Sequence, residues 1–241
     1  MPEQTASDHS VDNGNEVKNC FLLDSPDSER LIGAATQGSW LDVERRACPI
    51  NARHMPGKRR WNEIFVEVSH NKREETIIWT VGDCLMHESL LTEFERNGFT
   101  GYRPLPTKVR FRDGSVSDQY REIIVTGWAG TAHADSGIRL VEVCLACRSQ
   151  TYSRSGIPKQ LVDWDQWTGD HFFRVWPLAK RVFVTDEVAE FLKKSGPRSF
   201  DIYPAEKSPS FRYPGTMIVE PFSAHFPEDF AIRYGRPLGL E

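Results

Sequence analysis

The sequence predicts an α+β fold that is mostly antiparallel β with two or three short helices. Segments that alternate apolar and polar residues, or that are rich in β-branched residues, recur through the middle of the chain. Two other segments carry apolar residues at helical spacing and end at a glycine. The chain has 241 residues, enough for one large domain or two small ones and for a core that needs no disulfide.

The strands follow from local pattern. Residues 61–68 alternate, with Ile64 and Val66 on one side, and residues 76–81 are β-branched and apolar. A turn signal, Asp113-Gly114, separates two of the later strands. The predicted strands are 61–68, 76–81, 108–111, 123–126, 138–143, 181–184 and 216–219.

Two helices are predicted at 86–97 and 186–195. The first ends before Gly98, which suits a left-handed C-terminal cap. The second follows Thr185, a residue type that caps helix N-termini, and ends before Gly196. The segments around these helices, 82–105 and 180–204, look like one strand–helix–strand unit used twice: aligning the two glycines places Leu90 and Phe94 beside Val188 and Leu192. Either an architectural repeat or two ordinary β-α-β segments gives this pattern.

The pattern divides the chain into three parts. Residues 1–19 have almost no large apolar side chain and are expected to form a mobile tail. A polar connection at 148–160 is expected to be a loop or a minor boundary, with sub-units 20–147 and 148–204 on either side. The predicted parts are a polar tail (1–19), one α+β domain (20–204) and an extended C-terminal tail packed on that domain (205–241).

Composition excludes several classes of protein. Thirty basic and 34 acidic side chains give a net charge of −4, the wrong sign for general nucleic-acid binding. The sequence contains neither an apolar run of ~18 residues nor a secretory signal, so we expect no membrane association and a cytoplasmic location. Five cysteines are an odd number, compatible with a reducing compartment.

Cys144-Leu-Ala-Cys147 has the spacing of a metal-binding knuckle, because two intervening residues let both thiolates converge on one ion. A structural zinc site needs four ligands, and Cys48 with His54 is the first candidate pair for the other half. The alternatives are two buried reduced thiols or a redox pair. We expect His54 to begin a short basic loop that ends at Arg60. The remaining candidate ligands are Cys20, Cys84, His70, His87 and His133.

No catalytic motif is present in the sequence, which lacks GxSxG, HExxH, GxxxxGK[ST] and GxGxxG. Asp170 and His171 are either an acid/base pair or part of a loop that leads into a strand, and their aromatic surroundings favour the loop. We therefore expect a protein that is not an enzyme.

Five large aromatic residues gather between residues 162 and 176. Such side chains are either core or partner-binding anchors. Phe172, Phe173 and Trp176 are predicted to be core. Trp164 and Trp167 lie among aspartates, so we assign these two, together with Asp170, as candidate partner-binding residues.

The block 167–178, followed by 181–188 and the Gly196 helix end, resembles bacterial immunity proteins of polymorphic toxin systems, in particular the double-CXXCG motif family and the related Imm11-like group. The resemblance covers roughly residues 80–204. The pair Cys144 and Cys147 stands where that family has its second cysteine motif, but Arg148 replaces the expected glycine and the first motif is reduced to Cys48. His54 would then supply the fourth ligand.

The resemblance implies a non-enzymatic protein that binds a cognate toxin and covers its active face, with no membrane or direct nucleic-acid partner. The expected cofactor is at most a structural zinc ion. Two alternatives stay open: a metal-dependent enzyme or regulator that uses Cys144 and Cys147, and a generic interaction scaffold.

Overall fold

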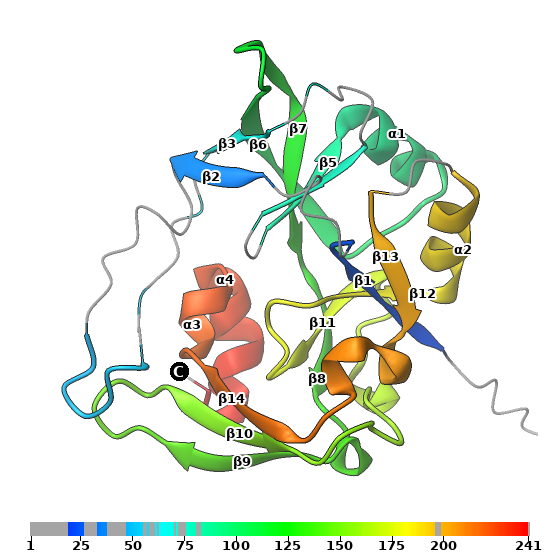
Figure 1. The fold of residues 1–241 in the computed structure, drawn as a ribbon. Coiled ribbons are helices and arrows are strands. Elements are labelled where there is room, and N and C mark those ends of the chain that lie inside the picture. Colours follow the sequence, from blue (N-terminus) through cyan, green and yellow to red (C-terminus); the bar gives the residue numbers. More distant parts are fainter. Residues whose placement is uncertain are drawn as a thin grey trace, which may run out of the picture.

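The structure is a computed structural model that describes residues 19–26, 33–37, 47–54, 57, 61, 63–69, 71, 76–80, 83–195 and 199–240. Its strands form three sheets, two of them mixed and mostly antiparallel and one wholly antiparallel, with short helices beside them (Figure 1). The predicted α+β class is confirmed. Most of the predicted N-terminal tail, the predicted basic residues 58–60 and the candidate ligand His70 lie outside the described residues.

The largest sheet has six strands in the order β2-β3-β6-β7-β5-β4. Its strands are β2 (Ala34–Gln37), β3 (Ile64–Glu67), β4 (Ile77–Trp79), β5 (Cys84–His87), β6 (Tyr102–Arg110) and β7 (Val116–Val125). All neighbours are antiparallel except β3 and β6. The predicted alternation of residues 61–68 is observed, because Ile64 and Val66 are fully buried.

Two smaller sheets complete the β structure. The first is β13-β1-β12-β11-β8 and the second is β14-β10-β9. Their strands are β1 (Cys20–Asp24), β8 (Gly127–Thr131), β9 (Ile138–Val143), β10 (Gln150–Arg154), β11 (Phe172–Trp176), β12 (Val182–Thr185), β13 (Asp201–Pro204) and β14 (Gly215–Val219). Strand β10 lies within residues 148–160, where we predicted a loop, so that prediction is wrong for this part. The buried Gln150 and Tyr152 alternate with half-buried neighbours, but the residues are too polar for the sequence to indicate a strand.

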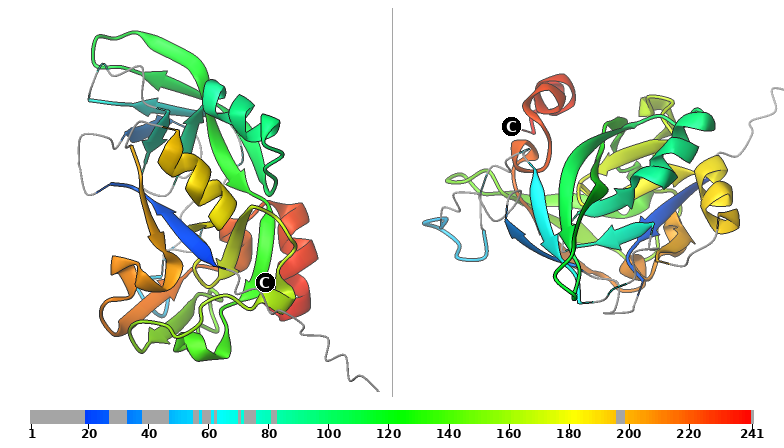
Figure 2. Two further views of the ribbon diagram at one scale, coloured as in Figure 1. Left: turned by 90° about the vertical axis from the view of Figure 1, so that its right-hand side faces the viewer. Right: turned by 90° about the horizontal axis from the view of Figure 1, so that it is seen from above.

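The two predicted strand–helix–strand units share one architecture. In one, β5 leads into α1 (Glu88–Arg96) and then β6; in the other, β12 leads into α2 (Asp186–Lys194) and then β13. In each unit an antiparallel strand, β7 or β1, lies between the two outer strands. The two helices lie side by side (Figures 1 and 2), with the rings of Phe94 and Phe191 5.7 Å apart. Leu90, Phe94, Val188 and Leu192 are all buried in one core cluster, as their alignment predicts.

The helix ends also match the predictions in part. Gly98 follows the first helix with a left-handed φ of 70°. Thr185 occupies the N-cap position of α2, but its side chain makes no capping hydrogen bond.

Strand β7 continues through Thr126 into β8, so one chain path joins the six-stranded sheet to the five-stranded one (Figure 2). The passage requires Gly127, because a Cβ atom there would lie 2.1 Å from the carbonyl oxygen of Phe172. This contact places the start of β8 against β11.

The C-terminal residues correct another prediction. Strand β14 forms where a β-like run was expected, but the chain beyond it is not extended: it forms α3 (Phe222–His225), α4 (Glu228–Phe230) and the helical turn Ala231–Gly235. Aromatic residues spaced four apart bring their rings together against Trp128 of β8. They are Phe222, Phe226, Phe230 and Tyr234. This helical spacing was the missed signal.

Within the residues that the structure describes, the helices are too short and too polar to traverse a lipid bilayer.

Candidate metal centre

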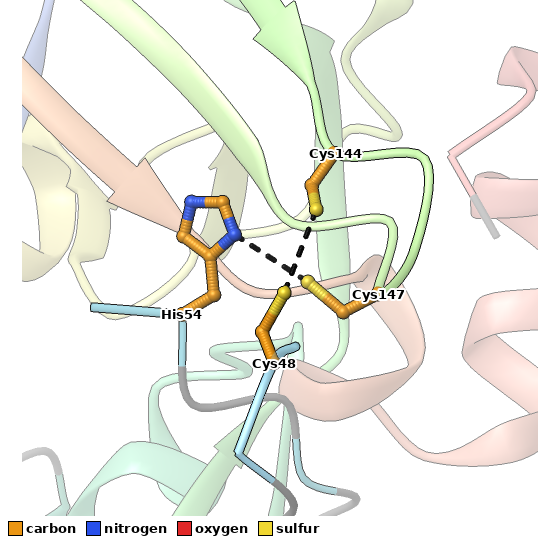
Figure 3. Close-up of side chains that lie close together, drawn as sticks. All are labelled: Cys48, His54, Cys144 and Cys147. Atoms are coloured by element: carbon orange, nitrogen blue, oxygen red, sulfur yellow. Dashed lines mark hydrogen bonds between the residues drawn. The ribbon is translucent and has the colours of Figure 1, made fainter. Parts of the chain in front are cut away.

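Four side chains from two distant segments converge at one point (Figure 3). Cys48 and His54 belong to the segment 47–54, whereas Cys144 and Cys147 lie on the turn between β9 and β10. Their ligand atoms all lie within 4.8 Å of one another. Cys48, His54 and Cys144 are buried and Cys147 is half-buried. The four candidate ligands named from the sequence therefore lie together, and His54, which also begins the predicted basic loop, is buried in the cluster.

The spacing of the cluster fits a tetrahedral zinc ion. With Zn–S bonds of about 2.3 Å and Zn–N bonds of about 2.0–2.1 Å, two ligand sulfurs lie about 3.8 Å apart, and a sulfur and a nitrogen about 3.6 Å apart. The Sγ atoms of Cys48 and Cys144 are 3.7 Å apart, and Cys147 Sγ lies 3.5 Å from His54 Nδ1. The donor set of three thiols and one imidazole is a combination that zinc prefers.

Local backbone conformation aims the sulfurs inward. The amides of Ile50 and Asn51 donate to the sulfur of Cys48, and together with the neighbouring thiols they lower its pKa although burial, the largest single influence, raises it. The amide of Cys147 donates to the sulfur of Cys144, and this hydrogen bond is the main reason for the lowered pKa of Cys144. Burial raises the pKa of Cys147 itself. These amides stabilise thiolates, the form in which cysteine binds a metal.

The turn that carries Cys144 and Cys147 needs a left-handed residue after the second cysteine. Arg148 has a φ of 63°, and its amide donates to the carbonyl oxygen of Cys144 at 2.8 Å. Glycine adopts such angles without strain, whereas an arginine in this conformation adds backbone strain to the turn.

Two polar neighbours lie next to the cluster. Asn51 Nδ2 is 3.3 Å from His54 Nε2, and the thiol of Cys147 donates to Ser149 Oγ at 3.3 Å. An amide nitrogen only donates, so the first contact leaves the proton of neutral His54 on Nδ1. Zinc at Nδ1 would move that proton to Nε2, and Asn51 would then present its amide oxygen after a rotation of its side chain.

The other candidate ligands lie elsewhere. Cys20 and Cys84 are buried in strands, where burial strongly raises the pKa of each thiol. The ring nitrogens of His87 and His133 accept backbone amides at the start of a helix and of a helical turn, so both residues act as caps.

The candidate partner-binding residues form a local network. The rings of Trp164 and Trp167 meet edge to face 5.4 Å apart, and both contact Phe173 of the core. Trp167 Nε1 donates to the carbonyl oxygen of Asp170, whose carboxylate accepts the hydroxyl of Thr168 at 2.6 Å. All three candidates are half-buried. Their role in partner binding stays a prediction.

His171 links the two strand–helix–strand units. Its Nδ1 accepts the amide of Thr100 and lies 3.1 Å from the hydroxyl of the same residue, while Nε2 lies 3.0 Å from the carboxylate of Glu187. Because the backbone amide already occupies Nδ1, we assign His171 to joining the turn after α1 to the first turn of α2.

Sequence reasoning missed one buried pair of titratable residues, His225 and Glu220. His225 Nε2 lies 3.1 Å from the carboxylate of Glu220, and only 3% of the histidine side chain is exposed. The two residues line a cavity of about 160 Å³ with Lys180 and Arg181. The helical spacing of the neighbouring aromatics was the one signal that could have placed His225 on a packed helix.

No protein-family model matches the chain, and no curated protein has significant sequence similarity to it. The candidate metal centre is therefore assigned from its own geometry.

Proposed function

We propose that this protein is a non-enzymatic binding protein that carries a structural zinc ion and neutralises a cognate toxin by covering the toxin's active face. The observation that carries the zinc part of the proposal is the cluster of Cys48, His54, Cys144 and Cys147, whereas the toxin part depends on the sequence resemblance. These four residues would hold the ion, which would cross-link the segment 47–54 to the β9–β10 turn.

The number of protein ligands favours a structural role over the alternative of a metal-dependent enzyme. Catalytic zinc sites combine three protein ligands with one position open to water or substrate, whereas structural sites have four protein ligands. Here four donors lie within 4.8 Å of one another and three of them are buried. An ion held by all four would have no position left for a reactant.

Exposed apolar side chains beside the cluster support a binding role. Ile50 and Leu145 lie on the two ligand-bearing segments and are 66% and 86% exposed. On the neighbouring edge strand β9, Leu140 and Val141 are 51% and 63% exposed. Aliphatic side chains that stay exposed to solvent on a rigid segment are typical of the apolar centre of a protein interface. We define Ile50 and Leu145 as the apolar rim of the metal centre.

The toxin as partner is supported by the resemblance of 167–178 and of the cysteine pair to immunity proteins. The net charge of −4 adds a modest attraction to a basic partner. A cytoplasmic location agrees with the five free cysteines, because a reducing compartment keeps ligand thiols available to the metal.

The test is co-expression of the chain with the product of the adjacent upstream gene, with host survival and a stable complex on a sizing column as readouts. We expect survival and a complex with the natural chain and loss of both with Leu145→Asp or Ile50→Asp. Val116→Asp is the matched control, since Val116 is 53% exposed on the β6–β7 hairpin, away from the metal centre (Figure 1). Absence of a complex with the natural chain would contradict toxin neutralisation by direct binding.

A further inference from the structure

A second site lies on the C-terminal side of the molecule, where three segments meet. A cavity of about 250 Å³ opens between the start of β6, the link from β7 to β8 and the helical residues after Pro227. Its charged lining consists of Arg103, Arg233 and Asp229, and the remaining lining residues are Thr126, Pro227, Phe230 and Tyr234.

The wall of this cavity is held in place by aromatic packing. Phe230 is buried, and its ring lies 5.7 Å from that of Trp128 and 4.7 Å from that of Tyr234. Tyr234 also stacks on Trp128 at 5.6 Å, and the guanidinium of Arg233 lies 5.0 Å from the centre of the Tyr234 ring. Arg233 therefore contacts a tightly packed aromatic surface.

The three charged side chains of the cavity are exposed. Among the residues that the structure describes, Arg103, Arg233 and Asp229 make no ion pair or side-chain hydrogen bond, and the one aromatic contact is that of Arg233 with the Tyr234 ring. Two guanidinium groups against one carboxylate leave an excess of one positive charge. Two like charges around one cavity repel each other, and an anion between them relieves that repulsion.

The size of the cavity indicates the kind of anion. A volume of about 250 Å³ is many times the roughly 10–15 Å³ that one water needs on this measure, so the cavity has room for more than one inorganic phosphate. Guanidinium groups bind phosphate and carboxylate oxygens through paired hydrogen bonds. Pro227 and the buried Phe230 offer apolar surface for the rest of a ligand.

We propose that this cavity binds a small organic oxyanion, a phosphate monoester or a carboxylate of about ten non-hydrogen atoms, through Arg103 and Arg233. The site is independent of the metal centre and of the toxin-binding role. Asp229 opposes the anion and weakens its binding, so its removal has an effect opposite in sign to the removal of either arginine.

The test is isothermal titration of the full chain at low salt with phenyl phosphate, benzoate and the neutral compound benzyl alcohol. We expect phenyl phosphate or benzoate to bind in a 1:1 complex and benzyl alcohol to bind at least tenfold more weakly. The tighter of the two anions identifies the head group as phosphate or carboxylate. Inorganic phosphate, which lacks the organic part, should bind more weakly than phenyl phosphate.

Variants provide the decisive comparison. Arg103→Gln and Arg233→Gln should each weaken anion binding by about tenfold or more, whereas Asp229→Asn should strengthen it severalfold. Arg112→Gln is the matched control, because Arg112 is also an exposed arginine but lies on the β6–β7 hairpin. NMR shifts of the Thr126 and Phe230 amides on addition of phenyl phosphate would locate the ligand without a variant. Absence of binding up to about 10 mM, equal binding of benzyl alcohol, or unchanged affinity in both arginine variants would overturn the proposal.

Discussion

The sulfur of Cys48 lies 3.7 Å from the sulfur of Cys144, although ninety-six positions separate the two residues along the chain. This separation is close to the edge of a tetrahedral zinc–thiolate site, about 3.8 Å. The contact brings the segment 47–54 to the β9–β10 turn, so the candidate metal centre joins parts of the molecule that share no sheet ladder. Four predictions follow from this link and from other contacts.

The purified protein should contain one zinc ion per chain, and removal of the ion should destabilise the fold. At a free zinc concentration a thousand times the Kd, binding adds about 4 kcal/mol to the free energy of unfolding. Cys48→Ser, Cys144→Ser and Cys147→Ser should each lose zinc and melt at a lower temperature, as measured by elemental analysis and calorimetry. Cys20→Ala should retain its zinc, because Cys20 lies in β1 outside the cluster. Unchanged melting in the Cys144 and Cys147 variants would rule out a structural metal.

Replacing Arg148 by glycine should stabilise the protein. A left-handed conformation costs a non-glycine residue about 1–2 kcal/mol, and glycine removes this strain. The greater freedom of glycine in the unfolded chain offsets about 0.4–1 kcal/mol of the stability gained in this way. The expected net increase in the free energy of unfolding is about 0.5–1 kcal/mol, measured by urea denaturation. The control is Arg53→Gly, because Arg53 is another exposed arginine near the cluster with no left-handed φ. A loss of stability in Arg148→Gly would show that the arginine side chain outweighs the strain.

The buried pair of His225 and Glu220 should make the fold sensitive to acid. Burial lowers the pKa of His225 below 6.5, assisted by the charges of Lys180 and Arg174 and opposed by Glu220. Burial raises the pKa of Glu220, but the hydrogen bond from His225 and the charge of Lys180 outweigh it and lower that pKa to about 2.

Both pKa shifts make the folded state less stable as the pH falls. The unfolded chain takes up a proton on His225 more readily than the folded one, so stability decreases as the pH falls below about 6.5. The contribution of Glu220 is present above its ordinary pKa of 4.5 and is lost as the pH falls from there toward 2. Urea denaturation between pH 7.5 and 5 should therefore show that the free energy of unfolding falls more steeply with decreasing pH in the natural chain than in His225→Gln. Identical slopes would mean that His225 is not the responsible group.

The joint between β7 and β8 should not tolerate a side chain at Gly127. A Cβ atom would lie 2.1 Å from the carbonyl oxygen of Phe172 and 2.5 Å from Cβ of Asp170, so the strands would have to separate. Gly127→Ala should lower the free energy of unfolding by about 3 kcal/mol. Gly215→Ala is the control, because the atom nearest to an added Cβ there is the end of the flexible Arg154 side chain, 3.5 Å away. Equal stability of the two variants would contradict the close approach.

Much of the local structure was predictable. Helical spacing and terminal glycines located α1 and α2, because a helix forms its hydrogen bonds within one segment. The spacing of Cys144 and Cys147 indicated a metal knuckle for the same reason, since two intervening residues suffice to bring two sulfurs together. The elements that were not predicted lack a clear local pattern. Strand β10 is polar, and Phe222, Phe226 and Phe230 lie in a proline-rich segment, a composition that favours extended chain.

The sequence by itself determined the α+β class, the two strand–helix–strand units and the choice of residues that could serve as metal ligands. Only the tertiary structure decided that Cys48 and His54 meet the knuckle, and that Arg103 and Arg233 line one cavity. The physical reason is the range of the interactions. Periodicity and capping act between residues a few positions apart, whereas these contacts depend on how three sheets pack and on where distant segments cross.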